Sequence, residues 1–151
     1  MIIILIILAI LFFSGLIIYN SLIAKKNQVA NDFGTLDALL KKRYDLIPNL
    51  VATVKGYAEH EKGVLTKITE LRSRAVSGQI KGDDTIALDS QMTGLLGKIM
   101  IVAENYPDLK ASQNFLKLQA ALNETEEQIS AGRRAYNAAV TDFNNAVEMF
   151  P

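Results

Sequence analysis

Residues 115–150 read FLKLQAALNETEEQISAGRRAYNAAVTDFNNAVEMF. Mostly apolar or small side chains recur along this stretch at alternating intervals of three and four residues, without a slip. Such a narrow seam is typical of an α-helix that packs nearly parallel to its neighbours. The stretch therefore predicts one long helix and an all-α fold class around it. The seam positions are Phe115, Leu118, Leu122, Thr125, Ile129, Gly132, Tyr136, Ala139, Phe143, Ala146 and Phe150.

The same helical spacing occurs in three segments further upstream. These segments predict four helices after residue 24, over about 25–46, 48–76, 84–105 and 112–149. Their apolar positions are Leu22, Val29, Phe33, Leu36 and Leu40, then Leu50 or Val51, Val54, Ala58, Leu65, Ile68 and Leu71, then Leu88, Met92, Leu95, Ile99, Val102 and Tyr106.

Three breaks separate the predicted helices. Pro48 is expected to open a helix with Asp45 as an upstream cap, because proline has no N–H to lose in a first turn. The segment Ser77–Asp84 carries two glycines and two aspartates, which predicts a loop that leads into a helix cap. Tyr106–Asp108 is the third break, since the residue before a proline is pushed out of the α region. Connections this short favour an antiparallel up-down four-helix bundle.

The first residues of the chain form a separate apolar segment. Residues 1–18, MIIILIILAILFFSGLII, contain no charge, and only Ser14 and Gly15 are not hydrophobic. A helix over residues 1–24 would be about 36 Å long, enough to cross the hydrocarbon core of a bilayer. Tyr19, Lys25 and Lys26 follow the apolar run as the expected membrane-interface residues. Residues 1–24 are thus predicted to be a transmembrane anchor, and residues 25–151 the bundle domain.

A cleaved signal peptide is the alternative interpretation of this segment. It requires a positively charged stretch before the apolar core and a small-x-small cleavage site after it, and the sequence shows neither. A membrane anchor is therefore favoured. Because the lysines lie on the C-terminal flank, the positive-inside rule predicts a single-pass protein whose C-terminal domain lies in the cytoplasm.

The composition excludes several classes of function. The chain has 151 residues with 16 basic and 16 acidic groups, no cysteine and one histidine. No disulfide framework, thiolate metal site or multi-histidine metal site is therefore possible within it. A net charge of zero argues against a general nucleic-acid binder, which would carry a basic excess.

The motifs that would indicate chemistry are incomplete. His60-Glu61 begins like a zinc-binding H-E-x-x-H motif, but position 64 is valine. The acidic cluster of Glu124, Glu126 and Glu127 lacks the Glu-x-x-His partners of a di-metal bundle site, which favours a solvated helix face. Phosphate-binding glycine loops and nucleophile elbows do not occur. We therefore expect no catalytic, cofactor-binding or metal-binding residues, and a non-enzymatic protein.

In the predicted topology, two connections lie at the end of the bundle far from the membrane. Lys41, Lys42 and Arg43 lie near the end of the predicted first helix. Cations at that place complement the helix dipole, which explains them without a binding partner. Residues 1–81 carry 11 basic and 6 acidic groups, whereas residues 82–151 carry 5 and 10. Pairing of the two halves inside the bundle explains this asymmetry better than partner binding. The candidate partner-contact tip comprises Lys41, Lys42, Arg43, Asp45, Pro48, Tyr106, Pro107 and Asp108.

Two tracts beside the breaks carry a family resemblance. The first is DLIPNLV at residues 45–51, continuing through TVKGYA at 53–58 to His60-Glu61. The second is ENYPDLKA at residues 104–111, followed by further matches as far as Phe150-Pro151. In these tracts the chain resembles the LemA family of bacterial membrane-anchored helical bundle proteins.

The resemblance implies an N-terminal membrane helix, a four-helix bundle, no established catalytic activity and a place in the bacterial inner membrane. One branch of the family is associated with building magnetosome membranes, and members often occur beside a membrane metalloprotease of the HtpX type. Family members usually continue for some tens of residues past the Phe-Pro pair. The chain is therefore expected to be either a short member or truncated after Pro151.

The leading functional hypothesis is a membrane-anchored helical scaffold or membrane-organising protein that self-associates into a homo-oligomer or recruits a membrane-protein partner. The predicted last helix, about 57 Å long, extends past a neighbour of about 33 Å and would leave part of its seam open unless another chain covers it. The alternative is an accessory subunit that presents clients to an HtpX-type membrane protease through the tip. A pilin-like filament subunit is a third possibility, but the early glutamate and the processing site of such subunits are missing.

Overall fold

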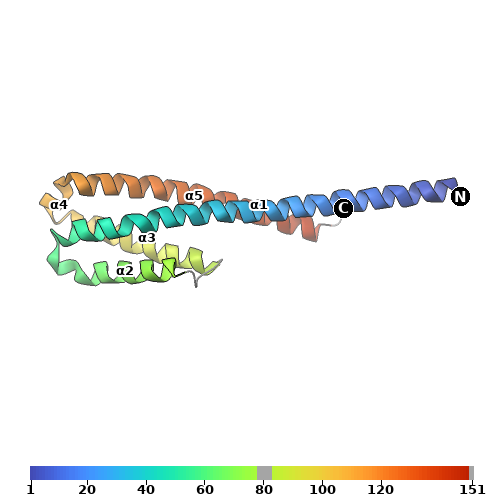
Figure 1. Ribbon diagram of the computed structural model, residues 1–151. Coiled ribbons are helices and arrows are strands. Elements are labelled where there is room, and N and C mark those ends of the chain that lie inside the picture. Colours follow the sequence, from blue (N-terminus) through green and yellow to red (C-terminus); the bar gives the residue numbers. More distant parts are fainter. Residues whose placement is uncertain (78–82, 150–151) are drawn as a thin grey trace. The chain divides into compact units, whose positions relative to one another are not determined.

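The computed structural model describes residues 1–77 and 83–149 (Figure 1). Within these ranges the regular structure is entirely helical, which confirms the all-α fold class. The middle of the predicted Ser77–Asp84 loop, the last seam position Phe150 and Pro151 lie outside the described residues. The elements are α1 (Ile2–Lys55), the 3-10 helix η1 (Glu59–Glu61), α2 (Lys62–Val76), α3 (Asp83–Ala103), α4 (Pro107–Ala111) and α5 (Gln113–Glu148).

The chain divides into two compact units. Unit 1 comprises Met1–Asp37 and Ser130–Pro151, and unit 2 comprises Ala38–Ile129. Unit 1 therefore contains the first part of α1 and the last part of α5. Unit 2 contains the end of α1, the beginning of α5 and the elements between them.

Each α-helix of unit 2, from α1 to α5, contributes buried side chains to its core. The helices α2 and α3 pack directly against each other. The positions predicted from helical spacing supply most of the buried side chains. In α3 the prediction is wrong by one residue at two places, since Leu96 and Ala103 are buried and the predicted Leu95 and Val102 are only half-buried. The buried apolar residues of unit 2 are Leu40, Tyr44, Ile47, Leu50, Val54, Ala58, Leu65, Ile68, Leu88, Met92, Leu96, Ile99, Ala103, Leu109, Phe115, Leu122 and Ile129.

Pro48 lies inside α1 and does not open a helix, so the prediction for this position is wrong. A proline inside a helix leaves the carbonyl four residues earlier without its N–H donor. That carbonyl belongs to Tyr44, and it accepts a hydrogen bond of 2.8 Å from Nε of Arg72 on α2. The side chain of a second helix thus supplies the missing donor, and α1 continues. Asp45 is accordingly an internal residue of α1, not a cap.

The first helix ends seven positions after the proline, at Lys55. The N–H groups of Tyr57 and Ala58 both donate to the carbonyl of Val54, at 3.0 and 2.8 Å, and close the last turn. The 3-10 helix η1 then leads into α2. Figure 1 shows this connection at the same end of unit 2 as α4.

The predicted break at Tyr106–Asp108 is confirmed. The backbone of Tyr106 is extended, with φ −122° and ψ 87°, and Pro107 occupies the first turn of α4. After this short helix, Ser112 is again extended, with ψ 122°. The chain therefore reverses through two bends, with the five residues of α4 between them.

The seam that predicted α5 is confirmed along its described length. Every described seam residue is buried or half-buried, and Phe115, Leu122, Thr125, Ile129 and Ala139 are buried. The later part of the seam belongs to unit 1, where α1 provides a second helix. There the rings of Phe33 and Tyr136 lie with their centroids 5.6 Å apart. The expected open overhang is therefore partly covered by the chain itself.

Candidate membrane anchor and contact surfaces

The apolar segment of α1 is exposed along its whole length. Within Ile2–Lys55 an 18-residue window has a mean hydropathy of 3.1, and none of it is buried. Exposed apolar surface of this extent is unfavourable in water but matches the hydrocarbon core of a bilayer. Asp84–Ala103 in α3 is also long and apolar enough to span a membrane, but 33% of its window is buried inside unit 2. The first helix is therefore the one that indicates membrane anchoring.

One polar side chain lies inside the apolar segment, and three residues that were predicted at the membrane interface follow it. Oγ of Ser14 donates a hydrogen bond of 2.9 Å to the carbonyl of Leu11, so its hydroxyl needs no water. Tyr19 and Lys26 are exposed immediately after the apolar run. Lys25 is half-buried and lines a shallow groove of about 260 Å³ that also contains Asp142. Their placement at the membrane interface remains a prediction.

The residues expected at a distal tip are not all available to a partner. Arg43 is only 2% exposed, so its side chain lies in the core of unit 2. The α1 members also lie along the helix and not in a turn, since α1 rises about 21 Å between Lys41 and its end at Lys55. Tyr106 is half-buried. The exposed members of the expected set are Lys41, Lys42, Asp45, Pro48, Pro107 and Asp108.

Arg43 is the centre of an ionic network that joins three helices. Its Nη1 donates to Oδ1 of Asp89 on α3 at 2.7 Å, and its Nη2 pairs with Oε2 of Glu126 on α5. Next to it, Nζ of Lys42 lies 3.7 Å from Oε1 of Glu124. Glu126 pairs with Arg43 while 38% of its side chain stays exposed, so it lies at the edge of the acidic face that was predicted on α5. Buried charges of this kind require a partner, which makes the network structural.

The described residues contain no gathered set of metal ligands. Within residues 1–77 and 83–149, no three histidine or acidic side chains come together as a metal ion would require. His60 is exposed on η1. The network around Arg43 contains two carboxylates, but both pair with the guanidinium.

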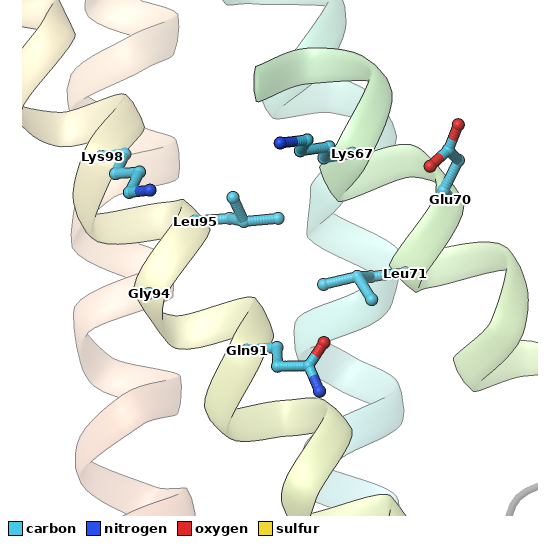
Figure 2. A pocket seen from close by; sticks show the side chains of 7 residues that line it. All are labelled: Lys67, Glu70, Leu71, Gln91, Gly94, Leu95 and Lys98. Carbon is cyan, nitrogen blue, oxygen red and sulfur yellow. The ribbon is translucent and has the colours of Figure 1, made fainter. Parts of the chain in front are cut away.

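Two grooves beside α2 were not anticipated from the sequence. One lies between α2 and α3 and measures about 390 Å³ (Figure 2), and the other lies between α1 and α2 and measures about 460 Å³. The first is lined by Lys67, Glu70, Leu71, Gln91, Gly94, Leu95 and Lys98, and the second by Val51, Lys55, Ala58, Lys62, Leu65, Thr66, Thr69 and Glu70.

Gly94 lines the first groove and contributes no side chain to it. A Cβ atom at this position would meet no atom within 4 Å, so the helix surface is open there. Leu71 and Leu95 were assigned to apolar seams, yet both are half-buried. The packing between α2 and α3 is therefore incomplete at these two leucines.

An exposed apolar helix followed by an all-helical unit defines a membrane-associated helical protein. The LemA family model matches residues 32–151, and the chain belongs to the LemA family. It is 30% identical over 131 residues to Protein LemA of Metamycoplasma hominis, across 87% of this chain and 60% of that protein. The predicted family is therefore confirmed.

Two further relatives are named as magnetosome proteins. The chain is 21% identical to Magnetosome protein MamQ 2 of Paramagnetospirillum magneticum, and 19% identical to Magnetosome protein MamQ of Magnetospirillum gryphiswaldense. Both alignments extend over 158 residues and cover 88% of this chain and 58% of the relative. The chain thus spans about three fifths of the length of the curated relatives that it matches.

Proposed function

We propose that this protein is a non-enzymatic, single-pass membrane protein that self-associates as a scaffold and organises the membrane around it. One observation carries the proposal: α1 is a single helix that begins with the apolar segment and also supplies Leu40 and Ile47 to the core of unit 2. LemA family proteins are not known as enzymes. We further propose that the long helices of unit 2 form the up-down four-helix bundle that the short connections favour.

Unit 1 supports the self-association. Outside the apolar segment it consists of two helical stretches, and within the described residues of this unit there is no third helix to cover them. The seam residues Phe143 and Ala146 are only half-buried, and Val147 and Met149 are 60% and 70% exposed. Confinement to a bilayer raises the effective concentration of such surfaces, so copies of the chain associate with a smaller entropic cost.

The mass of the extracted protein tests this proposal. The full-length protein is extracted from native membranes in a mild detergent and measured by size-exclusion chromatography with light scattering. We expect a large, discrete homo-oligomer that Val147→Asp dissociates and that Asn144→Asp, at an exposed polar position of the same helix, leaves intact. A monomer in detergent together with no crosslinked copies in native membranes contradicts the proposal.

The bacterial inner membrane is the proposed location, with unit 2 in the cytoplasm. Lys25 and Lys26 directly follow the apolar run, and lysines close to a membrane helix favour the cytoplasmic side.

The alternative function is that of an accessory subunit of an HtpX-type membrane protease. It is favoured by the exposure of Lys41 and Lys42, two cations that a partner could reach. The test is co-purification with such a protease before and after Lys41→Glu and Lys42→Glu. Arg43 stays unchanged, because its loss would destabilise the core of unit 2 and would not report on binding. An unaltered complex contradicts this alternative.

A further inference from the structure

The groove between α2 and α3 has an apolar floor that is open to solvent. In Figure 2, Leu71 on α2 and Leu95 on α3 point toward each other across the groove. Gly94 adds no side chain, and the space where its Cβ would lie is empty to 4 Å. Side chains of a second molecule can therefore reach both leucines and the helix surface between them.

Two cations stand over this floor from opposite walls. Figure 2 shows Lys67 on α2 and Lys98 on α3 extending into the groove, whereas Glu70 points away from it. Among the described side chains, no carboxylate forms an ion pair with either lysine. Two positive charges on opposite walls of one groove favour an anionic group between them.

The neighbouring groove extends the same charge along α2. Lys55 and Lys62 line it, and Glu70 is the acidic residue that lines both grooves. Four lysines and one glutamate therefore border the two grooves, so the surface on both sides of α2 is basic. This surface favours a partner whose charge is acidic.

We propose that the groove between α2 and α3 binds an acidic amphipathic segment of a partner protein. Apolar side chains of the segment would contact Leu71 and Leu95, and flanking carboxylates would pair with Lys67 and Lys98. Gln91 lines the groove as well and offers an amide that pairs with a peptide backbone, which an acyl chain lacks. We therefore favour a protein segment over an anionic lipid, whose headgroup would also pair with the lysines. This inference goes beyond self-association and does not depend on it.

The probe is a fluorescent synthetic peptide with leucines at positions i and i+4 and glutamates beside them. Its binding to the full-length protein in phosphatidylcholine nanodiscs is followed by fluorescence anisotropy, against matched peptides that carry glutamine or lysine in place of glutamate. We expect saturable binding of the acidic peptide, weakened by salt. The double variant Lys67→Glu, Lys98→Glu should weaken it by about tenfold or more, because it replaces both attractions with repulsion.

Matched variants separate the groove from the rest of the surface. The double variant Lys110→Glu, Lys117→Glu makes the same charge change at exposed positions outside the groove and should leave peptide binding unchanged. Gly94→Leu fills the groove, whereas Gly97→Leu makes the same change on α3 outside the lining, and both positions have room for a Cβ. Only the first should abolish binding.

Three results of the peptide-binding measurements would overturn the proposal, and a fourth would come from the lipid. The first three are no binding of the acidic peptide, binding no tighter than that of the glutamine peptide, or binding that Gly94→Leu does not alter. Competition by phosphatidylglycerol placed in the nanodiscs would assign the groove to an anionic lipid and overturn it equally. Light scattering on the detergent-extracted protein measures self-association separately. Failure of the groove proposal can therefore be distinguished from failure of the self-association proposal.

Discussion

Arg43 shows how a single charged residue can fix the arrangement of a helical core. Its side chain is 3% exposed and that of Asp89 is completely buried, so both charges have lost nearly all their hydration. Such a pair adds little net stability compared with apolar residues, but removal of one partner leaves a buried charge uncompensated. The pair joins α1 to α3 at one defined register, since any slip of either helix would separate the charges.

Replacement of this arginine should therefore be strongly destabilising. We expect Arg43→Met to lower the free energy of unfolding by about 3–5 kcal/mol, because Asp89 stays buried without its counter-charge. The measurement is urea denaturation of the full-length protein in detergent, followed by circular dichroism. The control is Lys42→Met, whose ion pair with Glu124 is 50% and 64% exposed and should be worth less than about 1 kcal/mol. Equal effects of the two variants would argue against a buried network.

The contact between Pro48 and Arg72 gives a second prediction at this scale. Arg72→Met should lower the free energy of unfolding by about 1–3 kcal/mol, because the part-buried carbonyl of Tyr44 would lose the hydrogen bond from Arg72. In a Pro48→Ala background the alanine N–H supplies that donor, so the same substitution should cost less. The double-mutant cycle is measured by urea denaturation. Purely additive effects would show that the arginine does not replace the missing N–H.

At the scale of the element, the 3-4 seam of α5 should determine which leucines stabilise the protein. Leu122 is 4% exposed and belongs to the seam, whereas Leu116 is 44% exposed and does not. We expect Leu122→Ala to lower the free energy of unfolding by about 2–5 kcal/mol, because it leaves a cavity in unit 2. Leu116→Ala, the same change in the same helix, should cost clearly less. The comparison is made by thermal and urea denaturation, and similar losses would contradict the seam.

The elements also show which features the sequence could predict. The periodicity of α5 depends on local spacing, so it identified the buried face correctly from Phe115 to Ala146. The continuation of α1 through Pro48 depends on a contact between Arg72 and Tyr44, which are 28 residues apart, and a rule about proline in first turns contains no such information. The burial of Arg43 depends likewise on Asp89 and Glu126. The groove beside Gly94 depends on how α2 lies against α3, so spacing within one helix could not predict it.

At the scale of the whole molecule, the uneven charge of the two halves of the sequence has a structural counterpart. Lys42 and Arg43 belong to the basic first half, and their partners Asp89, Glu124 and Glu126 belong to the acidic second half. Charges of the basic half thus pair with charges of the acidic half inside unit 2, as predicted. Lys67 and Lys98 stand apart from this pairing, which distinguishes the groove that they border from the rest of the charged surface.

The orientation of the protein in the membrane can be tested with one introduced thiol. The sequence contains no cysteine, so Ser73→Cys places a unique, exposed label on α2. Because Lys25 and Lys26 favour the cytoplasmic side, we expect no reaction with a membrane-impermeant maleimide in intact spheroplasts, and full reaction after the membrane is permeabilised. The permeabilised sample is the control for reactivity of the thiol. Labelling of intact spheroplasts would place unit 2 outside the cell, and its partners would then be sought among extracytoplasmic proteins.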